Sequence, residues 1–200
     1  MFELNEQVTE QLPAIVVSDI VPLPNNEIRV EINRPEDIKA LKSAEQYRNY
    51  IFLMLPSKND TQNEVIDNYY KRGVVAKIVL NMTNPNGSRR VKLQTIVRAD
   101  VEEFVLTSPH LLVKFTTQPS ISSDSDKEVA TLELIKQELV SNNKMMPVLE
   151  NKDAILNSLR KGISSAEFSD VIAINIIGDF KSHLKYLFEL DITKRLLMIL

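Results

Sequence analysis

The sequence has no cysteine, which excludes both a disulfide and a thiolate metal site. Its only two histidines, His110 and His183, lie in different halves of the chain, so a histidine metal pair is not expected. The four glycines form neither a G-x-x-x-x-G-K-[ST] phosphate loop nor a G-x-S-x-G nucleophile elbow. Acidic pairs such as Glu102-Glu103 would point to opposite faces of a strand and could not act together as acid and base. The residues therefore predict no catalytic, cofactor or metal site.

Long hydrophobic runs and a strong net charge are also missing. The net charge is −3 at pH 7, which gives no general attraction for nucleic acid or an anionic membrane. No apolar run reaches the roughly 20 residues that a bilayer-spanning helix needs. The first residues, MFELNEQVTEQ, are acidic and polar, unlike a signal peptide. We expect a soluble, cytoplasmic protein.

Short β-branched runs fill the first half of the chain, and they predict strands. Runs such as YIFLML and LLVKFTT are separated by turn residues. VVAKIVLNM and RRVKLQTIV flank TNPNGS, where Asn86-Gly87 suits a tight hairpin. A second hairpin is expected at residues 107–110, and RPEDIKALKSAEQ predicts a helix with Pro35 in its first turn. Many short strands with one helix indicate a curved sheet or partly closed barrel.

The second half has a helical pattern, so the predicted fold class is α+β. Residues 119–126, within the polar stretch QPSISSDSDK, are expected to form a flexible linker. The linker would join a β domain, residues 1–118, to an all-α helical bundle, residues 127–200.

Capping residues mark the starts of the predicted helices. Ser125 and Ser164 each precede a glutamate by three residues, as in a capping box, and Asp191 precedes the last apolar-faced segment. A further helix is expected between Pro147 and Gly162. The buried face of the first of these helices is predicted to be Val129, Leu132, Ile135 and Leu139.

Three motifs follow one another along the chain. LPAIVVSDIVPLP has the form L-P-x-x-x-x-x-D-x-V-x-x-P, through Leu12, Pro13, Asp19, Val21 and Pro24. YKRGVVAKI has the form Y-x-x-G-x-x-A-x-I, through Tyr70, Gly73, Ala76 and Ile78. The helical half carries a D-x-I-A segment and then D-x-x-x-R-L, through Asp170, Ile172, Ala173, Leu187, Leu190, Asp191, Arg195 and Leu196. Their order and spacing resemble the N-terminal, substrate-recognition domain of the Lon family of ATP-dependent proteases.

The resemblance implies a non-catalytic region with a PUA-like β domain and a helical bundle. In the family this region recognises and tethers unfolded or degron-bearing proteins and helps to organise a homo-hexamer. Family members continue into an AAA+ ATPase, which uses ATP and Mg²⁺, and a Ser–Lys protease domain; neither is present in this sequence. The helix after Asp191 is expected to lead toward that ATPase. We therefore expect the chain to be a fragment of a longer protein.

The resemblance also suggests where clients bind. Two loops that lie close together in the family's β domain supply a candidate apolar patch for weak, multivalent capture, namely Leu23, Pro24, Met82 and Pro85. The alternative for these residues is loop packing that caps the barrel. Met145 and Met146 are a second candidate, for which core packing at a helix end is the stronger interpretation.

Two other functions stay open. PUA-like domains elsewhere bind RNA, and four tyrosines lie near basic residues here, namely Tyr47, Tyr50, Tyr69 and Tyr70 with Arg48, Lys71 and Arg72. The acidic net charge argues against RNA as a partner. A purely architectural role in holding a hexamer together is the other alternative.

Overall fold

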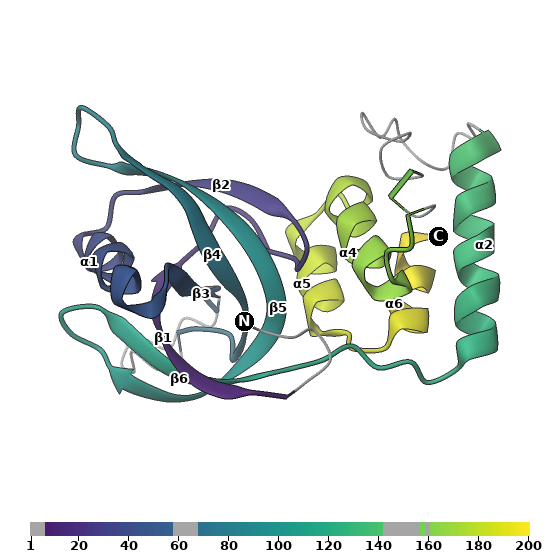
Figure 1. The fold of residues 1–200 in the computed structure, drawn as a ribbon, viewed down its shortest axis with the longest axis horizontal. Coiled ribbons are helices and arrows are strands. Elements are labelled where there is room, and N and C mark those ends of the chain that lie inside the picture. The colour runs from purple at the N-terminus through teal and green to yellow at the C-terminus, as the bar shows by residue number, and fades with distance from the viewer. Residues whose placement is uncertain (1–6, 58–67, 142–156, 159–160) are drawn as a thin grey trace. The chain divides into compact units, whose positions relative to one another are not determined.

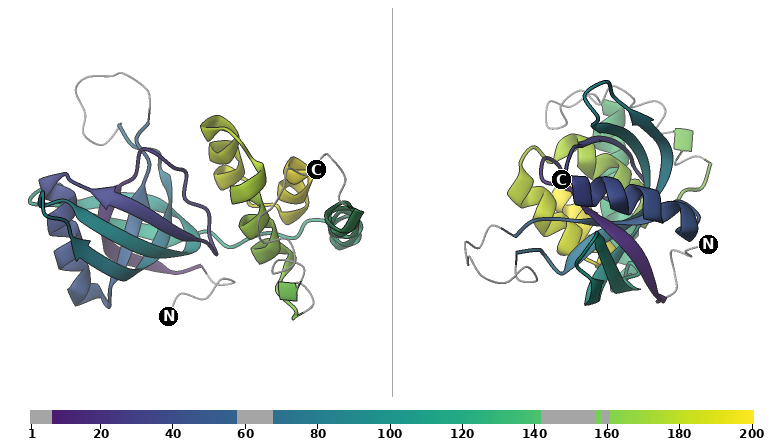
Figure 2. Two further views of the ribbon diagram at one scale, coloured as in Figure 1. Left: turned by 90° about the horizontal axis from the view of Figure 1, so that it is seen from above. Right: turned by 90° about the vertical axis from the view of Figure 1, so that its left-hand side faces the viewer.

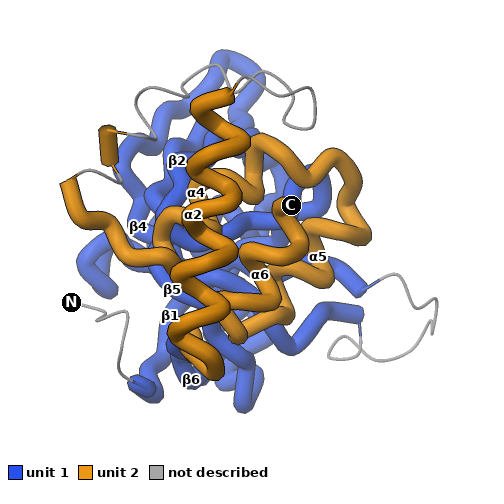
Figure 3. The backbone as a smooth tube through the Cα atoms, turned by 90° about the vertical axis from the view of Figure 1, so that its right-hand side faces the viewer, with its two compact units in different colours: residues 1–119 blue, residues 120–200 orange. Residues whose placement is uncertain are grey.

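The computed structural model describes residues 7–57, 68–141, 157–158 and 161–200 (Figure 1). The chain divides into two compact units, residues 1–119 and residues 120–200, which Figure 3 distinguishes by colour. The break, between residues 119 and 120, falls at the start of the expected linker. Each unit is described separately below.

The first unit is built on a six-stranded mixed sheet with the order β2-β5-β4-β3-β1-β6. β6 also pairs with β5, so a ring of pairings runs through β5, β4, β3, β1 and β6, while β2 is added to the outside of β5. β1 and β3 run parallel, and the other pairs are antiparallel. The elements are β1 Thr9–Val16, β2 Glu27–Ile32, α1 Pro35–Ser43, η1 Ala44–Tyr47, β3 Tyr50–Met54, β4 Arg72–Thr83, β5 Arg89–Leu106 and β6 Leu111–Thr117.

Both predicted hairpins and the predicted helix of this unit are confirmed. The β4–β5 turn is closed by two backbone hydrogen bonds, from Gly87 N–H to Asn84 O (2.9 Å) and from Asn84 N–H to Ser88 O (2.8 Å). Gly87 has φ +85°, which only glycine adopts without strain. The second turn joins β5 to β6 at residues 107–110, and α1 begins at Pro35. α1 packs against β1 and β6 (Figure 2).

The core of the first unit lies between the strands. Phe52 of β3 and Phe115 of β6 are fully buried, with ring centroids 5.3 Å apart. Leu12, the first residue of the L-P motif, is buried in the same cluster. Gly73, from the Y-x-x-G motif, lies where a β-carbon would meet the Leu53 carbonyl oxygen and the Phe52 ring. The motif glycine therefore allows β4 to approach β3 closely.

The second unit contains α2 Ser125–Ser141, α4 Ser165–Ile176, α5 Phe180–Phe188 and α6 Ile192–Ile199. α6 packs against both α2 and α4. Two predicted caps are confirmed: Ser164 Oγ accepts the Glu167 N–H (3.2 Å), and Asp191 Oδ1 accepts the Lys194 N–H (2.9 Å). Most of the helix expected between Pro147 and Gly162 lies outside the described residues, as do Met145 and Met146. No described helix is both long and apolar enough to cross a membrane.

Two expectations about the start of this unit are wrong. The predicted flexible linker is held in place, because Ile121 N–H donates to Leu190 O (2.8 Å) and Ile192 N–H donates to Ile121 O (2.9 Å). α2 is capped by Asp124, whose Oδ1 accepts the Lys127 N–H (3.0 Å), and not by Ser125. The predicted buried face of α2 is confirmed at Ile135 and Leu139, which are buried together with Thr131. It is wrong at Val129, which is 58% exposed, and Leu132 is half-buried.

Candidate functional site

The surroundings of β4 change midway along the strand. Val74, Val75 and Ala76 are fully buried, whereas Val79, Leu80 and Met82 are 56%, 46% and 50% exposed. β3 pairs with β4 only over Val74–Lys77, and a register shift between Ile78 and Leu80 follows. Beyond that shift, β4 and the start of β5 extend to the turn as a hairpin, residues 79–92, which we call the hairpin arm. β2 pairs with the far side of β5 here, from Arg29 opposite Lys92 to Ile32 opposite Arg89, so only the β4 side of the arm lacks a described strand neighbour.

Apolar and cationic side chains share one face of the hairpin arm. The register places Leu80 opposite Lys92 and Met82 opposite Arg90, so these four side chains point to the same side of the sheet. The other face is covered at Val91, which is fully buried. With Pro85 exposed at the turn, the arm presents a surface that we call the hairpin patch, consisting of Val79, Leu80, Met82 and Pro85.

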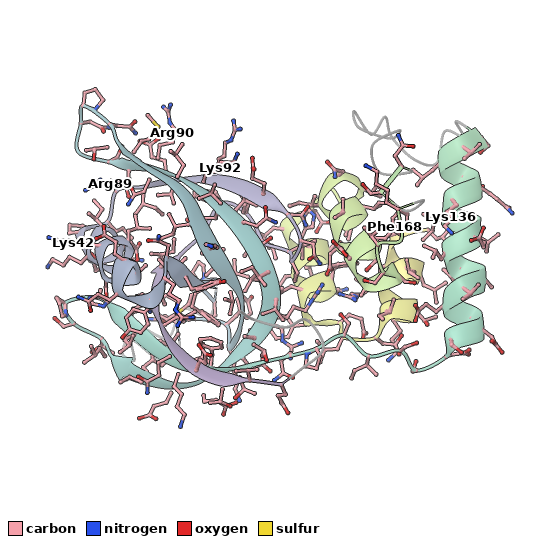
Figure 4. The ribbon with its side chains drawn as sticks, in the orientation of Figure 1. Lys42, Arg89, Arg90, Lys92, Lys136 and Phe168 are labelled. Atoms are coloured by element: carbon pink, nitrogen blue, oxygen red, sulfur yellow. The ribbon has the colours of Figure 1, made fainter. Side chains whose placement is uncertain are left out.

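Three cations lie beside the hairpin patch, and their side chains are labelled in Figure 4. Lys92 Nζ forms an ion pair with Glu27 Oε2 on β2 (2.7 Å). Arg89 Nη1 donates to Thr83 Oγ1 (2.6 Å). Arg90 is exposed and forms no ion pair with any described residue. In the register Arg90 lies opposite Glu31 of β2, whose Oε1 accepts hydrogen bonds from Ser88 Oγ and Asn84 Nδ2. The arm therefore offers an apolar edge next to an exposed arginine.

The structure does not bring Leu23 and Pro24 to this surface. Both are buried, and their carbonyl oxygens accept hydrogen bonds from Thr95 Oγ1 (2.6 Å) and Asn26 Nδ2 (2.7 Å) respectively. The prediction that these two residues join Met82 and Pro85 in one exposed patch is wrong. Their burial fits the loop-packing alternative.

The strand register explains the separation. β2 pairs with β5 from Glu27 opposite Gln94 to Ile32 opposite Arg89. The loop before β2 and the β4–β5 turn therefore lie at opposite ends of β2, about 17 Å apart at roughly 3.3 Å per residue. Sequence reasoning missed Val79 and Leu80 instead. The available signal was length, since the run GVVAKIVLNM exceeds the YIFLML run that covers it.

The tyrosines considered for RNA binding do not line a basic groove. A hollow of about 500 Å³ lies beside Tyr69 and Phe104, whose ring centroids are 6.3 Å apart. Tyr70 and Lys71 also line it, but so do two glutamates, Glu102 and Glu103. Arg72 is buried and donates two hydrogen bonds to the Asp100 carboxylate (2.7 and 2.8 Å). These carboxylates oppose the positive groove that RNA requires. Within the described residues, no group of three or more histidine or acidic side chains could hold a metal ion.

The third sequence motif has a structural role in the second unit. Arg195 is fully buried, and its Nη1 lies 3.1 Å from Asp170 Oδ1. Its Nη2 donates to Ser120 Oγ (2.8 Å), so one side chain ties α6 to α4 and to the first residue of the unit. The aspartate before α6 is the helix cap already described. These contacts account for the spacing of D-x-x-x-R-L without any ligand.

Comparison with known proteins decides the family. The sequence model of the ATP-dependent protease La (LON) substrate-binding domain matches residues 11–200. The chain belongs to this family. The match confirms the resemblance that the three motifs suggested.

Relatives and solved structures agree with the family assignment. The chain is 26% identical over 199 residues to the Lon protease of Aster yellows witches'-broom phytoplasma, covering 99% of this chain and 25% of that protein. It is 28% identical over 128 residues to the Lon protease of Parabacteroides distasonis, covering 64% of this chain and 16% of that protein. The chain thus spans a quarter or less of the length of these relatives.

Two solved structures share the fold. The N-terminal domain of the Mycobacterium avium complex Lon protease has a TM-score of 0.71 at 18% identity and covers 95% of this chain and 96% of its own. The Lon N-terminal domain protein from Xanthomonas campestris has a TM-score of 0.59 at 13% identity, with 94% and 95% covered. The mixed sheet with several helices is therefore the Lon N-terminal domain fold.

Proposed function

We propose that this chain captures unfolded protein clients through the hairpin patch, as the non-catalytic N-terminal part of a Lon-type ATP-dependent protease. The observation that carries the proposal is the exposure of Val79, Leu80 and Met82, about half of each side chain, on the hairpin arm. Exposed apolar groups gathered in one place commonly mark an interaction surface. The family's description as a substrate-binding domain supports the same role.

The form of the hairpin patch suits clients without a fixed shape. Its exposed side chains lie along a strand edge, so it can contact many different apolar segments. Met82 adds a flexible, polarizable side chain, which adapts to different partners. We expect affinities of tens of micromolar, or roughly −6 kcal/mol, for one domain. Several copies in a hexamer would raise the overall avidity.

The remaining parts of the proposal concern the whole protein. ATP hydrolysis with Mg²⁺ and peptide cleavage by a Ser–Lys dyad belong to domains outside this sequence. The first unit serves as a PUA-like, barrel-like client-binding domain, and the second as a helical bundle that leads toward the ATPase. The protein acts in the cytoplasm.

The test is an amide-resolved NMR titration of the chain with a permanently unfolded model protein and with a folded control protein. Replacing Leu80 and Met82 together (Leu80→Ser with Met82→Ser) removes two half-exposed apolar side chains. We expect client affinity to fall roughly thirtyfold, since burying their remaining surface is worth about 2 kcal/mol. Amide shifts should concentrate in the hairpin arm and appear only with the unfolded client.

A matched control lies near the other end of β5. Val105 and Leu106 are also apolar and exposed, at 36% and 42%. The double variant Val105→Ser with Leu106→Ser should bind the unfolded client as the wild-type chain does. Equal losses in both double variants would show non-specific adhesion, and no shifts at millimolar client would leave the chain an architectural domain.

A further inference from the structure

The outer edge of β4 is open along the hairpin arm. Among the described residues, pairing with β3 ends at Lys77, and Ile78 N–H donates to Asn49 O (2.8 Å). From Val79 to Thr83, the described partner of β4 is β5 alone. A strand edge of this kind is a template for another strand.

The hydrogen-bond alternation identifies the groups that face outward. The bond from Asn84 N–H to Ser88 O makes that pair a hydrogen-bonded one at the turn. In an antiparallel ladder the next pair, Thr83 with Arg89, is then non-bonded, and Asn81 with Val91 is non-bonded too. The backbone N–H and C=O groups of Asn81 and Thr83 therefore point away from β5, toward the open edge.

We propose that an extended client segment binds this edge as an added antiparallel strand, with apolar residues at alternate positions and an acidic residue at its flank. The inference rests on the proposed function and specifies how the client is held. It adds directional backbone hydrogen bonds to the apolar contacts of the hairpin patch. Strand addition supplies affinity through the main chain and specificity through alternate side chains.

The geometry of the hairpin arm determines which client residues form backbone hydrogen bonds and which make side-chain contacts. Client residues opposite Asn81 and Thr83 form the backbone hydrogen bonds. Client residues opposite Leu80 and Met82 occupy non-bonded pairs, in which Cα atoms approach to about 4.5 Å and side chains touch. Those positions require apolar side chains, because Leu80 and Met82 are the side chains they meet.

The positive charge of Arg90 favours an acidic residue at the flank of the client segment. Arg90 lies beside Met82 on the same face, one strand in from the edge. Strand spacing puts it about 10 Å from the backbone of an added strand, within reach of a long acidic side chain. Lys92 is already ion-paired with Glu27. Glu31, the residue opposite Arg90, accepts hydrogen bonds from Ser88 and Asn84 and, within the described part of the chain, forms no ion pair with Arg90. Arg90 is therefore the cation that gains most from an acidic client.

Strand addition predicts that the chain discriminates against folded proteins. Strands of folded proteins already use their N–H and C=O groups in their own sheets, whereas an unfolded segment has them available. Self-association through the same edge is limited by its short length and by the register shift after Ile78, both of which blunt an edge. The arm therefore favours unfolded clients without requiring a defined sequence.

N-methylated peptides test the proposal on the full 200-residue chain. The probe is a blocked peptide in which valine and threonine alternate, with glutamate at each end. N-methylation of the threonines removes the donors that would face β4, and we expect at least about tenfold weaker binding. N-methylation of the valines removes donors on the far side and should change affinity by less than about twofold.

The outcomes separate this inference from the proposed function. A larger loss of affinity on methylating the threonines, with exchange protection of the Asn81 and Thr83 amides, supports antiparallel strand addition. A larger loss on methylating the valines would indicate a parallel strand and overturn the proposed direction. Equal losses of affinity from the two methylation patterns would overturn strand addition. If the peptide fails to bind while the unfolded protein still requires Leu80 and Met82, strand addition is wrong and capture by the patch stands. If neither binds, both proposals fail.

The Arg90→Glu variant tests whether Arg90 favours an acidic residue at the flank of the client segment. The variant should bind the glutamate-flanked peptide about fivefold more weakly and a lysine-flanked peptide more tightly than the wild-type chain does. A matched control is Arg29→Glu, at an exposed arginine on β2 that lies beyond β5 from the open edge. Equal effects of the two reversals would show only general electrostatic attraction and would overturn the assignment of Arg90.

Discussion

The inner and outer halves of β4 contain similar residues in opposite surroundings. Val74 and Val75 are fully buried, while Val79 and Leu80, a few positions further, are half exposed. The difference comes from the neighbours of the strand, because β3 covers only the inner half. Burial in a sheet is thus decided by the length of the partner strands as much as by the strand's own sequence.

The two halves should therefore contribute to different properties. Full burial of an aliphatic side chain stabilises a fold by about 1.5–3 kcal/mol, so the inner half holds the first unit together. The outer half contributes much less, which leaves its apolar side chains available for clients. Substitutions in the two halves should separate stability from binding.

The largest expected effect is at Gly73 in the inner half. A β-carbon there would overlap the Leu53 carbonyl oxygen and lie 2.6 Å from Phe52 Cε1. Because the obstacle includes backbone, Gly73→Ala should lower the free energy of unfolding by at least about 3 kcal/mol, measured by urea denaturation.

A glycine in open space provides the control. A β-carbon at Gly178 would meet no atom within 4 Å, so Gly178→Ala should change stability by less than about 1 kcal/mol. Wild-type stability of Gly73→Ala would mean that β4 and β3 are not as closely apposed as the structure has them.

Local chemistry made much of the fold predictable. The β4–β5 turn follows from Asn86-Gly87, and the starts of α4 and α6 follow from Ser164 and Asp191, each acting within a few residues. The failures depend on distant partners. Nothing near Ser120 or Ile121 indicates that they would be tied to residues of α6 some 70 positions later.

The candidate site was predictable only in part, for the same reason. Met82 and Pro85 follow from their place beside a turn, and both are exposed. Leu23 is buried and bonded to Thr95, which is 72 residues away in sequence. The exposure of Leu80 depends on where β3 stops pairing, which the apolar pattern of β4 alone does not reveal.

A middle-sized effect is expected at Asp37, a buried carboxyl of α1. Burial raises the pKa of Asp37 from its ordinary 3.8 to about 6, although Arg34 opposes the shift. The folded protein therefore binds this proton more tightly than the unfolded chain does. Its stabilising contribution is complete below about pH 4 and is lost as the pH rises through about 6.

Asp37→Asn should remove this loss of stability at higher pH, because an amide carries no charge that burial would penalise. Relative to the wild-type chain, the variant should be more stable by about 2 kcal/mol at pH 7 and show little difference near pH 4. Urea denaturation at a series of pH values measures both. A variant that is less stable at pH 7 would show that the contacts of Asp37 with Arg34 and the Val16 N–H outweigh the cost of burying its charge.

The smallest effect on stability is expected in the hairpin arm, and two methionines allow a matched test. Met54, on β3, is 1% exposed, and Met82 is 50% exposed. Met54→Ser should cost about 3 kcal/mol, because it leaves a cavity and buries a hydroxyl. Met82→Ser should cost less than about 0.5 kcal/mol while weakening the binding of an unfolded client. If Met82→Ser instead destabilised the chain as Met54→Ser does, loss of binding would reflect unfolding, and the hairpin arm would belong to the core and not to a client-binding surface.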